Sequence, residues 1–328
     1  MNDNYAVDGE TRVEIYRRMA LLKANDERSR KVIKTGRLMM PYYSYRGQEC
    51  IPAALAVNLT DRDYLCTIYR GIHDMLAKGL PLKELWAEIA GRIDGSCKGK
   101  GGPMHLTSPD KGIMVTTGIV GSSMPIANGL ALAAQLSGDG RVAVATFGDG
   151  ASNIGAFHEA LNMASVWKLP AIFLCQNNQY GEHTTYEKAT SALRIADRAI
   201  AYNMPGVRVD GNDPLAVHAV TLEAIERARN GGGPTLIEAM TFRFHGHIYG
   251  DDDAYMDPAR KKAAMEADPV PIYRASLIAG GFATEESLSR IETEIEAALD
   301  EAVEYALASP MPGEEELTTD VYAEGAAA

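Results

Sequence analysis

An acidic residue and an amide residue follow two apolar runs in the middle of the chain. Asp149 stands in Gly148-Asp149-Gly150, directly after the run 142–147, and Asn177-Asn178 directly follows the run 171–176. Carboxylate and amide oxygens are ligands that Mg²⁺ prefers, and Mg²⁺ usually shares its coordination shell with substrate phosphates. These residue types therefore indicate a magnesium–phosphate site, provided that the fold brings Asp149 and Asn178 together.

The elements predicted around these residues would bring them together. Both runs are short, apolar and partly β-branched, which is typical of buried strands. Between them, apolar residues recur at helical spacing, namely Phe157, Ala160, Leu161, Ala164 and Trp167. A strand, a helix and a second strand form a βαβ unit, whose strands run parallel. Because open α/β sheets bind ligands at the carboxyl ends of their strands, Asp149 and Asn178 should meet at a ligand site.

The spacing gives this pair a more specific meaning. Gly148-Asp149-Gly150 and Asn177-Asn178 are separated by 26 residues, and this pattern resembles the metal–diphosphate motif of thiamine diphosphate (ThDP) enzymes. In that family the aspartate, the second asparagine and a backbone carbonyl two residues later bind Mg²⁺. The resemblance implies those metal-binding roles for Asp149, Asn178 and Tyr180. It also implies that the neighbouring residues Gly150, Ala151 and Gly181 contact the cofactor.

Other interpretations of the glycine-rich turn stay open. Gly-Asp-Gly is a common turn, and Gly138-Asp139-Gly140, which lacks the Asn-Asn partner, is interpreted as one. Gly148-x-Gly150 also begins a dinucleotide fingerprint, although Asn153 stands where the third glycine should be. A nucleotide-binding module without ThDP and an inactive assembly subunit are therefore the alternative functions.

A further strand end supplies an arginine. The run 64–68 predicts a strand, and Tyr69-Arg70-Gly71 follows it. Arg70 could form a structural ion pair, but at a ligand edge its guanidinium is better suited to holding phosphate oxygens. The Tyr69-Arg70 pair resembles a diphosphate-contacting pair in the α subunits of the E1 components of 2-oxo acid dehydrogenases.

Two glycine-rich segments resemble the same E1 α subunits. The string Lys98-Gly99-Lys100-Gly101-Gly102-Pro103-Met104-His105 occurs in them, whereas its spacing is too short for a phosphate-binding P-loop. Gly118-Ile119-Val120-Gly121 matches a loop that lies against the ring system of the cofactor in the family. The resemblance thus implies that Gly118 and Val120 contact ThDP.

A histidine-rich segment follows a predicted strand. The sequence 242–247, Phe-Arg-Phe-His-Gly-His, matches an E1 α pattern whose second histidine reaches the diphosphate and the active-site mouth. That position is His247, which the resemblance makes a catalytic and cofactor-binding candidate. Two histidines beside Asp251, Asp252 and Asp253 could instead form a transition-metal site, although His-x-His alone is not a metal signature.

Three positions that depart from the closest family patterns bear on the substrate. The resemblance would place Tyr43, Ile72 and Thr116-Thr117 at the substrate mouth, and Tyr43 is the second catalytic candidate. Ile72 would make the mouth less polar, which favours a ligand with a more apolar substituent. Together with Asp110-Lys111-Gly112, which resembles acetoin-type subunits, this predicts acetoin or a related ketone as substrate. Pyruvate or another 2-oxo acid is the alternative.

The resemblance extends over about residues 10 to 310 and carries expectations for the whole chain. It implies one domain, 1–328, with a doubly wound parallel α/β sheet, helices on both faces and a C-terminal helical extension from about 257. Periodicity predicts helices at 12–34, 47–59, 81–93, 125–135, 190–202, 214–230 and 285–307, and further strands at 207–209 and 235–243.

The same resemblance implies an oxidoreductase that needs other components. The cofactors would be ThDP and Mg²⁺. The glutamate that activates the cofactor would lie on a separate β subunit, in an α₂β₂ assembly, and the acyl group would pass to a lipoyl-bearing E2 acyltransferase. This chain would then hold the diphosphate half of the site.

Composition narrows the remaining classes of function. The net charge of −12 argues against nucleic acid or an anionic membrane as a partner. No apolar stretch reaches the length of a transmembrane span. The four cysteines, Cys50, Cys66, Cys97 and Cys175, form no CxxC pair, so we expect free thiols and a cytoplasmic location.

Overall fold

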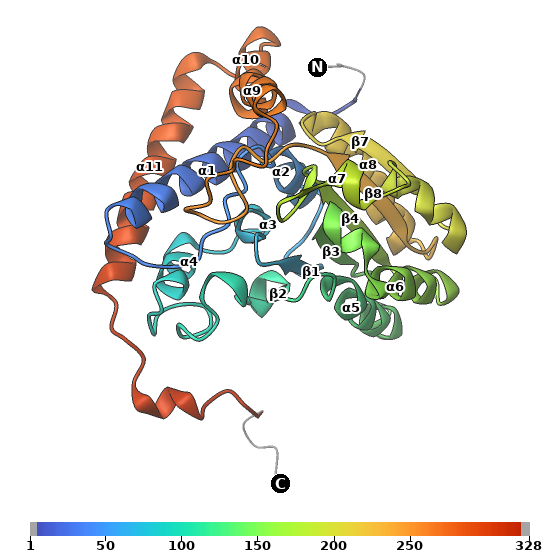
Figure 1. Cartoon of the computed structure of the whole chain (residues 1–328), viewed down its shortest axis with the longest axis horizontal. Helices are drawn as coiled ribbons and strands as arrows, with labels where there is room; N and C mark the ends of the chain where they lie inside the picture. Colours follow the sequence, from blue (N-terminus) through green and yellow to red (C-terminus); the bar gives the residue numbers. More distant parts are fainter. Residues whose placement is uncertain (1–4, 323–328) are drawn as a thin grey trace.

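A six-stranded sheet organises the molecule in a computed structural model, of which we describe residues 5–322 (Figure 1). Its strand order is β2-β1-β3-β4-β8-β7, and every pairing in it is parallel. The strands are β1 (Tyr64–Ile68), β2 (Ile113–Thr117), β3 (Ala143–Gly148), β4 (Ala171–Asn177), β7 (Gly206–Asp210) and β8 (Thr235–Met240). A small antiparallel hairpin of β5 (Tyr180–Gly181) and β6 (Thr184–Thr185) stands apart.

Helices cover both faces of this sheet. The α-helices are α1 (Gly9–Lys34), α2 (Cys50–Ala56), α3 (Ile72–Ala77), α4 (Leu82–Ile89), α5 (Ser123–Ser137), α6 (Gly155–Val166), α7 (Tyr186–Ala189), α8 (Pro214–Arg229), α9 (Pro258–Glu266), α10 (Pro269–Ala279) and α11 (Glu285–Ala308). The 3₁₀ helices are η1 (Gly102–Met104), η2 (Pro109–Lys111), η3 (Asp149–Asn153), η4 (Ile195–Tyr202) and η5 (Glu314–Leu317).

Alternation along the strands divides the buried side chains into two cores. Successive strand residues point to opposite faces of a sheet, so a strand covered on both faces is apolar throughout. Val144, Ile172, Leu174 and Ile237 pack on the side of α1, α2 and α8. Ala145, Phe147, Phe173 and Cys175 pack on the side of α5, α6 and η4. The predicted fold class, a parallel sheet with helices on both faces, is therefore confirmed.

The chain reverses its winding direction between β1 and β3. From β1 it moves outward to β2, then returns through α5 to β3 on the other side of β1. Adjacent connections therefore leave the sheet in opposite directions at this point, which opens a crevice beyond the strand ends. Asp149 follows β3 here, and Arg70 follows β1.

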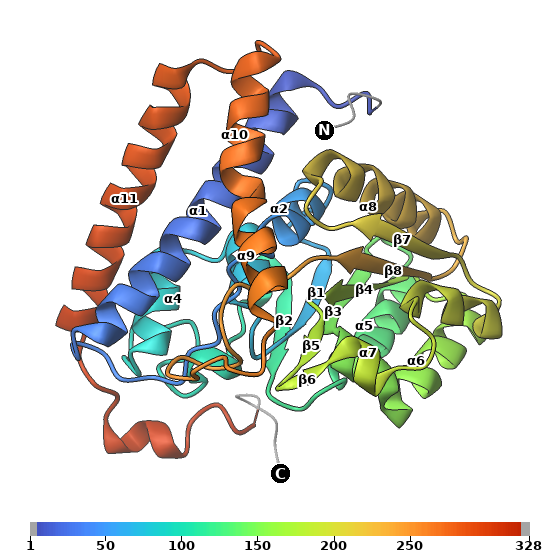
Figure 2. The same ribbon diagram turned by 45° about the horizontal axis from the view of Figure 1, so that its top comes forward.

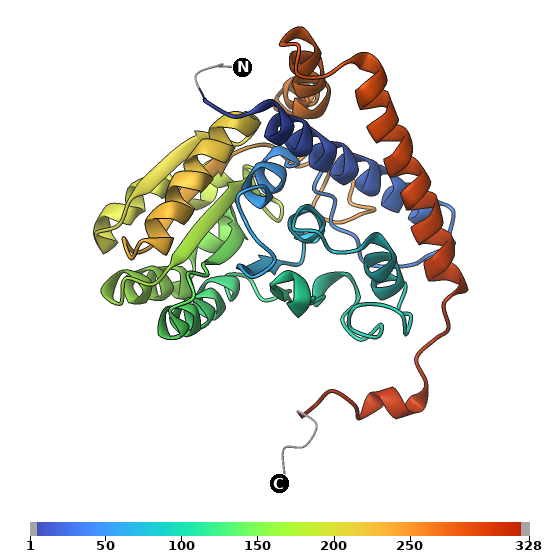
Figure 3. The ribbon, with the colours of Figure 1, turned by 180° about the vertical axis from the view of Figure 1, so that it is seen from behind.

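The C-terminal helices lie outside the sheet layers. In Figure 2, α10 and α11 lie beside the long α1, and Figure 3 shows α1 and α11 side by side from behind. No helix within residues 5–322 is long and apolar enough to cross a membrane.

Several predicted elements differ from the structure at their boundaries. The helix predicted at 190–202 is a 3₁₀ helix that begins at Ile195, and the one predicted at 47–59 is limited to α2. Gly47 has φ +97°, and a Cβ there would lie 2.1 Å from the carbonyl oxygen of Phe242, so helical backbone cannot begin at this residue. The edge strand β2 was not predicted, and the strand predicted at 235–243 ends at Met240.

Candidate active site

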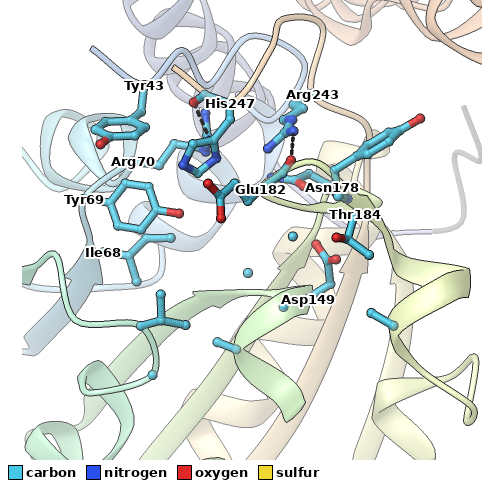
Figure 4. A pocket seen from close by; sticks show the side chains of 18 of the residues that line it. Tyr43, Ile68, Tyr69, Arg70, Asp149, Asn178, Glu182, Thr184, Arg243 and His247 are labelled. Carbon is cyan, nitrogen blue, oxygen red and sulfur yellow. Dashed lines mark hydrogen bonds between the residues drawn. The ribbon is translucent and has the colours of Figure 1, made fainter. Parts of the chain in front are cut away.

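A cavity of about 660 Å³ opens beyond the carboxyl ends of β1, β3, β4 and β8 (Figure 4). The residues predicted from the sequence to be catalytic or to bind cofactor or metal line it, namely Tyr43, Tyr69, Arg70, Gly118, Val120, Asp149, Gly150, Ala151, Asn178, Tyr180, Gly181 and His247. The parallel arrangement of the strands brings these residues together, although their positions span more than half of the chain.

Asp149 begins η3 at the end of β3, and its side chain is only 2% exposed. Burial raises the pKa of this carboxyl to about 6. In the part of the chain that the structure describes, its Oδ1 atom has no hydrogen-bond partner. An unpartnered buried carboxylate oxygen is costly, and a cation at this position would remove the cost. The side chain therefore fits a metal ligand.

Asn178 lies on the turn between β4 and the β5–β6 hairpin. Its Nδ2 donates to Gln48 Oε1 at 2.8 Å, and its Oδ1 accepts the Tyr180 N–H at 3.3 Å. This turn packs tightly against the end of β3, because a Cβ on Gly150 would lie 3.3 Å from Gly181 Cα. Glycine at both positions allows the two backbone segments to approach.

Two buried guanidinium groups lie at the cavity wall. Arg70 is 3% exposed and donates to the backbone oxygens of Ser44 and His247. Burial lowers its pKa to about 10, and the charge of Arg243 contributes, but the group remains cationic at neutral pH. Among residues 5–322, neither Arg70 nor Arg243 forms an ion pair. Two buried cations without carboxylate partners favour an anionic ligand.

Arg243 is a site residue that the sequence analysis missed. It follows β8, is 1% exposed, and donates to Tyr255 Oη at 2.9 Å and to the Glu182 carbonyl (Figure 4). Its Nε has no partner among the described residues. Like Arg70, Arg243 follows a strand, because β8 ends at Met240, whereas the sequence predicted Arg243 as the last residue of that strand.

His247 is held against the arginines with its ring partly buried. Burial, followed by the charges of Arg70 and Arg243, lowers the pKa of His247 to about 4, so the ring is neutral at pH 7. Its backbone N–H donates to Asp251 Oδ2 at 2.7 Å and to Tyr255 Oη at 2.8 Å. A neutral imidazole has one N–H donor and one acceptor nitrogen, so the ring can form a hydrogen bond of either kind at the cavity wall.

The neighbouring histidine has a different environment. His245 Nε2 lies 2.7 Å from the guanidinium of Arg30 on α1, and the residue does not line the cavity. The described residues contain no group of three or more His, Cys, Asp or Glu side chains arranged to hold a metal ion. The transition-metal interpretation of this segment therefore lacks a set of ligands.

An aromatic cluster forms another wall. The rings of Tyr43 and Tyr69 lie 4.6 Å apart in an edge-to-face arrangement, and His247 lies 5.3 Å from Tyr43. Met104, from the glycine–lysine string, and Val120 complete this part of the wall. The surroundings are therefore apolar, with polar groups only at the ring edges.

The predicted positions of Ile72 and Thr116-Thr117 at the mouth are wrong. Ile72 begins α3 and belongs to the hydrophobic core, and Thr116 Oγ1 contacts Met75 Sδ at 3.0 Å. Thr117 Oγ1 accepts hydrogen bonds at 3.0 Å from Ile119 N–H and from the Ser122 hydroxyl. Thr117 therefore holds the loop 118–121 in place by hydrogen bonds. None of the three side chains lines the cavity, so none of them makes it less polar.

The glycine–lysine string folds around a buried carboxylate. Glu88 accepts backbone N–H bonds, at 2.7 to 3.0 Å, from Cys97 just before the string and from Gly99, Gly101 and Gly102 within it. Lys98 and Lys100 extend the other way, to Glu316 and Asp320. Because these N–H groups already have an acceptor, this loop does not hold a phosphate as a P-loop would.

Comparisons with known proteins agree with this geometry. A model of the dehydrogenase E1 component family matches residues 16–315. The chain is 42% identical to the alpha subunit of acetoin:2,6-dichlorophenolindophenol oxidoreductase from Bacillus subtilis, over 94% of this chain and 92% of that protein. It is 39% identical to the subunit of the same name from Cupriavidus necator, over 96% and 95%.

A pyruvate-oxidising relative matches at lower identity. The alpha subunit of the pyruvate dehydrogenase E1 component from Rhizobium meliloti is 35% identical, over 94% of this chain and 89% of that protein. These three relatives are aligned over 89% or more of their own length. The family model matches most of this chain. The chain therefore belongs to the dehydrogenase E1 component family of oxidoreductases.

Proposed function

We propose that the cavity binds ThDP together with Mg²⁺. The side-chain oxygens of Asp149 and Asn178 and the backbone carbonyl of Tyr180 would hold the metal, and Arg70 and His247 would hold the diphosphate. The observation that carries this proposal is that, within residues 5–322, the buried Oδ1 of Asp149 has no partner and the two buried arginines of the same cavity form no ion pair. Arg243 would be a third diphosphate contact.

Bound ThDP would supply a thiazolium group that stabilises the carbanion formed when a carbon–carbon bond breaks. The residues of this chain would position that group and exclude water. Gly118 and Val120 would lie against its ring system, and the neutral ring of His247 would hold or release a proton at its edge. Tyr43 would close the substrate side of the same wall.

We propose that the chain is the α subunit of an E1 enzyme that cleaves acetoin or a related ketone. The acyl group would then pass to a lipoyl-bearing E2 acyltransferase. The two acetoin-named relatives are 42% and 39% identical to this chain, against 35% for the Rhizobium pyruvate-named one. Oxidation of pyruvate or another 2-oxo acid is the second candidate, because several pyruvate-named relatives also match.

A β subunit would complete the enzyme, in an α₂β₂ assembly. Beside the cavity, Ile119 and Val120 are 71% and 49% exposed, and the adjoining α5 contains no charged residue. We propose that the β subunit covers this apolar surface. We also propose that residues 1–328 form one ThDP-binding domain and that the chain is cytoplasmic, in keeping with its four free cysteines.

The substrate is tested with the chain reconstituted with its β subunit. Dye reduction is measured side by side with acetoin, pyruvate and branched 2-oxo acids, each with and without ThDP and Mg²⁺. We expect the largest kcat/KM for acetoin. A larger kcat/KM for pyruvate would show that pyruvate, and not acetoin, is the substrate. Dye reduction that does not depend on ThDP would refute the proposed cofactor.

The arginine contacts predict a loss of cofactor affinity. Arg70→Lys and Arg243→Lys retain a charge but lose the guanidinium fork, and charge-assisted hydrogen bonds are worth about 1.5–3 kcal/mol each. Calorimetry on the reconstituted assembly should show ThDP affinity about tenfold weaker or more in each variant. Arg141→Lys is the matched control, because Arg141 precedes β3 at the opposite edge of the sheet. Unchanged ThDP affinity would assign Arg70 and Arg243 purely structural roles.

A further inference from the structure

A chain of buried amide side chains runs inward from Asn178. Asn178 Nδ2 donates to Gln48 Oε1 at 2.8 Å, and Gln48 Nε2 donates to Gln176 Oε1 at 3.0 Å. Gln176 Nε2 in turn donates to Asp74 Oδ1 at 2.7 Å. All four side chains are at most 5% exposed. The chain therefore connects the proposed metal site to a carboxylate on α3.

Asp74 is anchored on its other oxygen. Thr67 Oγ1 donates to Asp74 Oδ2 at 2.6 Å, and Thr146 Oγ1 donates to the same atom at 2.7 Å. Thr67 lies on β1, three residues before Arg70, and Thr146 lies on β3, three residues before Asp149. Asp74 is thus fixed to the two strands that carry the cavity residues.

The direction of the amide chain depends on Asp74. An amide group has a donor end and an acceptor end, so a row of amides alone can run in either direction. A carboxylate can only accept hydrogen bonds, which makes Gln176 present its nitrogen to Asp74 and its oxygen to Gln48. Gln48 must then present its oxygen to Asn178, and Asn178 must present its nitrogen to Gln48.

His73 supports the same direction. Its Nε2 lies 2.7 Å from Gln176 Oε1 and 3.4 Å from Gln48 Nε2, and we assign the proton to this nitrogen because the shorter contact is to an oxygen that can only accept. The His73 ring is fixed by stacking on Tyr45, with centroids 4.8 Å apart and an interplanar angle of 7°. A reversed Gln176 would face this N–H with its own NH₂ group, and two donors would then oppose each other.

We propose that Asp74 is a positioning residue that determines which atom of Asn178 binds the metal. Because the Asn178 nitrogen is committed to Gln48, its oxygen is the atom left for Mg²⁺. In the reversed chain an NH₂ group, whose hydrogens carry partial positive charge, would face the cation and Asp149 would lose a co-ligand. The inference rests on the proposed function, since it assumes that Asn178 binds Mg²⁺.

Moving the carboxylate from position 74 to position 176 tests whether Asp74 sets the direction of the amide chain. Asp74→Asn is nearly isosteric but can donate or accept, so both directions become possible. In the double variant Asp74→Asn/Gln176→Glu, the carboxylate stands at position 176 instead. There it accepts from Gln48, from His73 and from the amide introduced at position 74, which restores the original direction. Thr67→Val is the matched control, because it removes a hydrogen bond from Asp74 without changing the direction of the amides.

The readout is the Mg²⁺ concentration that gives half-maximal ThDP binding to the reconstituted αβ assembly, measured by calorimetry. Removing an outer-shell partner of a metal ligand typically weakens metal affinity about 10–100-fold, so Asp74→Asn should raise this concentration at least tenfold. The double variant should return to near the wild-type value, and Thr67→Val should remain there. The thermal midpoint of the metal-free assembly monitors folding.

An unchanged Mg²⁺ dependence in Asp74→Asn, or no recovery in the double variant, would overturn the inference and leave the proposed function standing. Binding of ThDP to the wild type without any Mg²⁺ dependence would overturn both the inference and the proposed function.

If Asp74→Asn does not fold, the variants Gln48→Glu and Gln48→Leu test the inference instead. A carboxylate at position 48 loses the bond to Gln176 Oε1 but can still only accept from Asn178, which fixes the direction of that amide, so the Mg²⁺ dependence of Gln48→Glu should stay near wild type. The apolar side chain of Gln48→Leu leaves Asn178 free to reverse and should weaken Mg²⁺ binding.

Discussion

Asp149→Asn should abolish Mg²⁺-dependent ThDP binding by the reconstituted assembly and, at the same time, stabilise the metal-free chain at pH 7. The variant keeps the shape of the side chain but removes the charge that the metal needs. That charge lies in a site where burial raises the pKa of the carboxyl to about 6. Removing it also removes the cost of desolvating a carboxylate.

The pH dependence of stability follows from the direction of the pKa shift. Because the folded chain binds the Asp149 proton more tightly than the unfolded chain does, this group makes folding less favourable as pH rises from about 4 to about 6. Above that range the cost is complete, on the order of 3 kcal/mol at 1.36 kcal/mol per pKa unit. Asp149→Asn should therefore have a larger free energy of unfolding than wild type above pH 6, and the same free energy of unfolding below pH 4.

Calorimetry gives the binding result, and denaturant unfolding of the metal-free chain at pH 4 and pH 7 gives the stability result. Asp139→Asn is the matched control, since Asp139 stands in the other Gly-Asp-Gly, away from the cavity, where it is partly exposed and paired with Arg141. Retained Mg²⁺-dependent binding in Asp149→Asn would contradict the metal assignment. An Asp149→Asn chain less stable than wild type at pH 7 would contradict the desolvation argument.

The parts of the site that the sequence predicted share one physical feature. Asp149, Asn178 and Arg70 each follow an apolar run, and parallel strands bring the residues after such runs to one edge. Local pattern is therefore sufficient for these three residues. Arg243 did not meet this rule as predicted, because it was the last residue of the predicted strand 235–243, whereas β8 ends at Met240 and leaves Arg243 at the same edge.

Other parts of the site could not be predicted in this way. Ile72 is also near a strand end, but it begins a helix, and the direction of a first-turn side chain depends on how that helix packs. The amide chain joins Gln176 and Asn178, at the end of β4, to Gln48 and Asp74, which lie on two other segments of the polypeptide. No spacing relates these residues, because only the packing of α3 against the ends of β1 and β4 brings them into hydrogen-bond contact.

The isolated chain should show no ThDP-dependent turnover, and mixing with its β subunit should raise activity at least 100-fold. The family resemblance places the glutamate that activates the cofactor on the β subunit, so this chain would supply the diphosphate contacts without the activating group. Activity should appear together with an α₂β₂ mass in solution scattering. Robust turnover by the isolated chain would refute the requirement for a partner.

The same experiment locates the surface that the partner covers. Ile119→Asp places a charge on the most exposed apolar residue of the 118–121 loop, and burying a charge without a partner in an interface is costly. The variant should therefore bind the β subunit at least tenfold more weakly. Leu222→Asp, on α8 against the opposite face of the sheet, should bind as wild type does. If both variants assembled normally, the β subunit would have to approach the cavity from a side that leaves Ile119 in solvent.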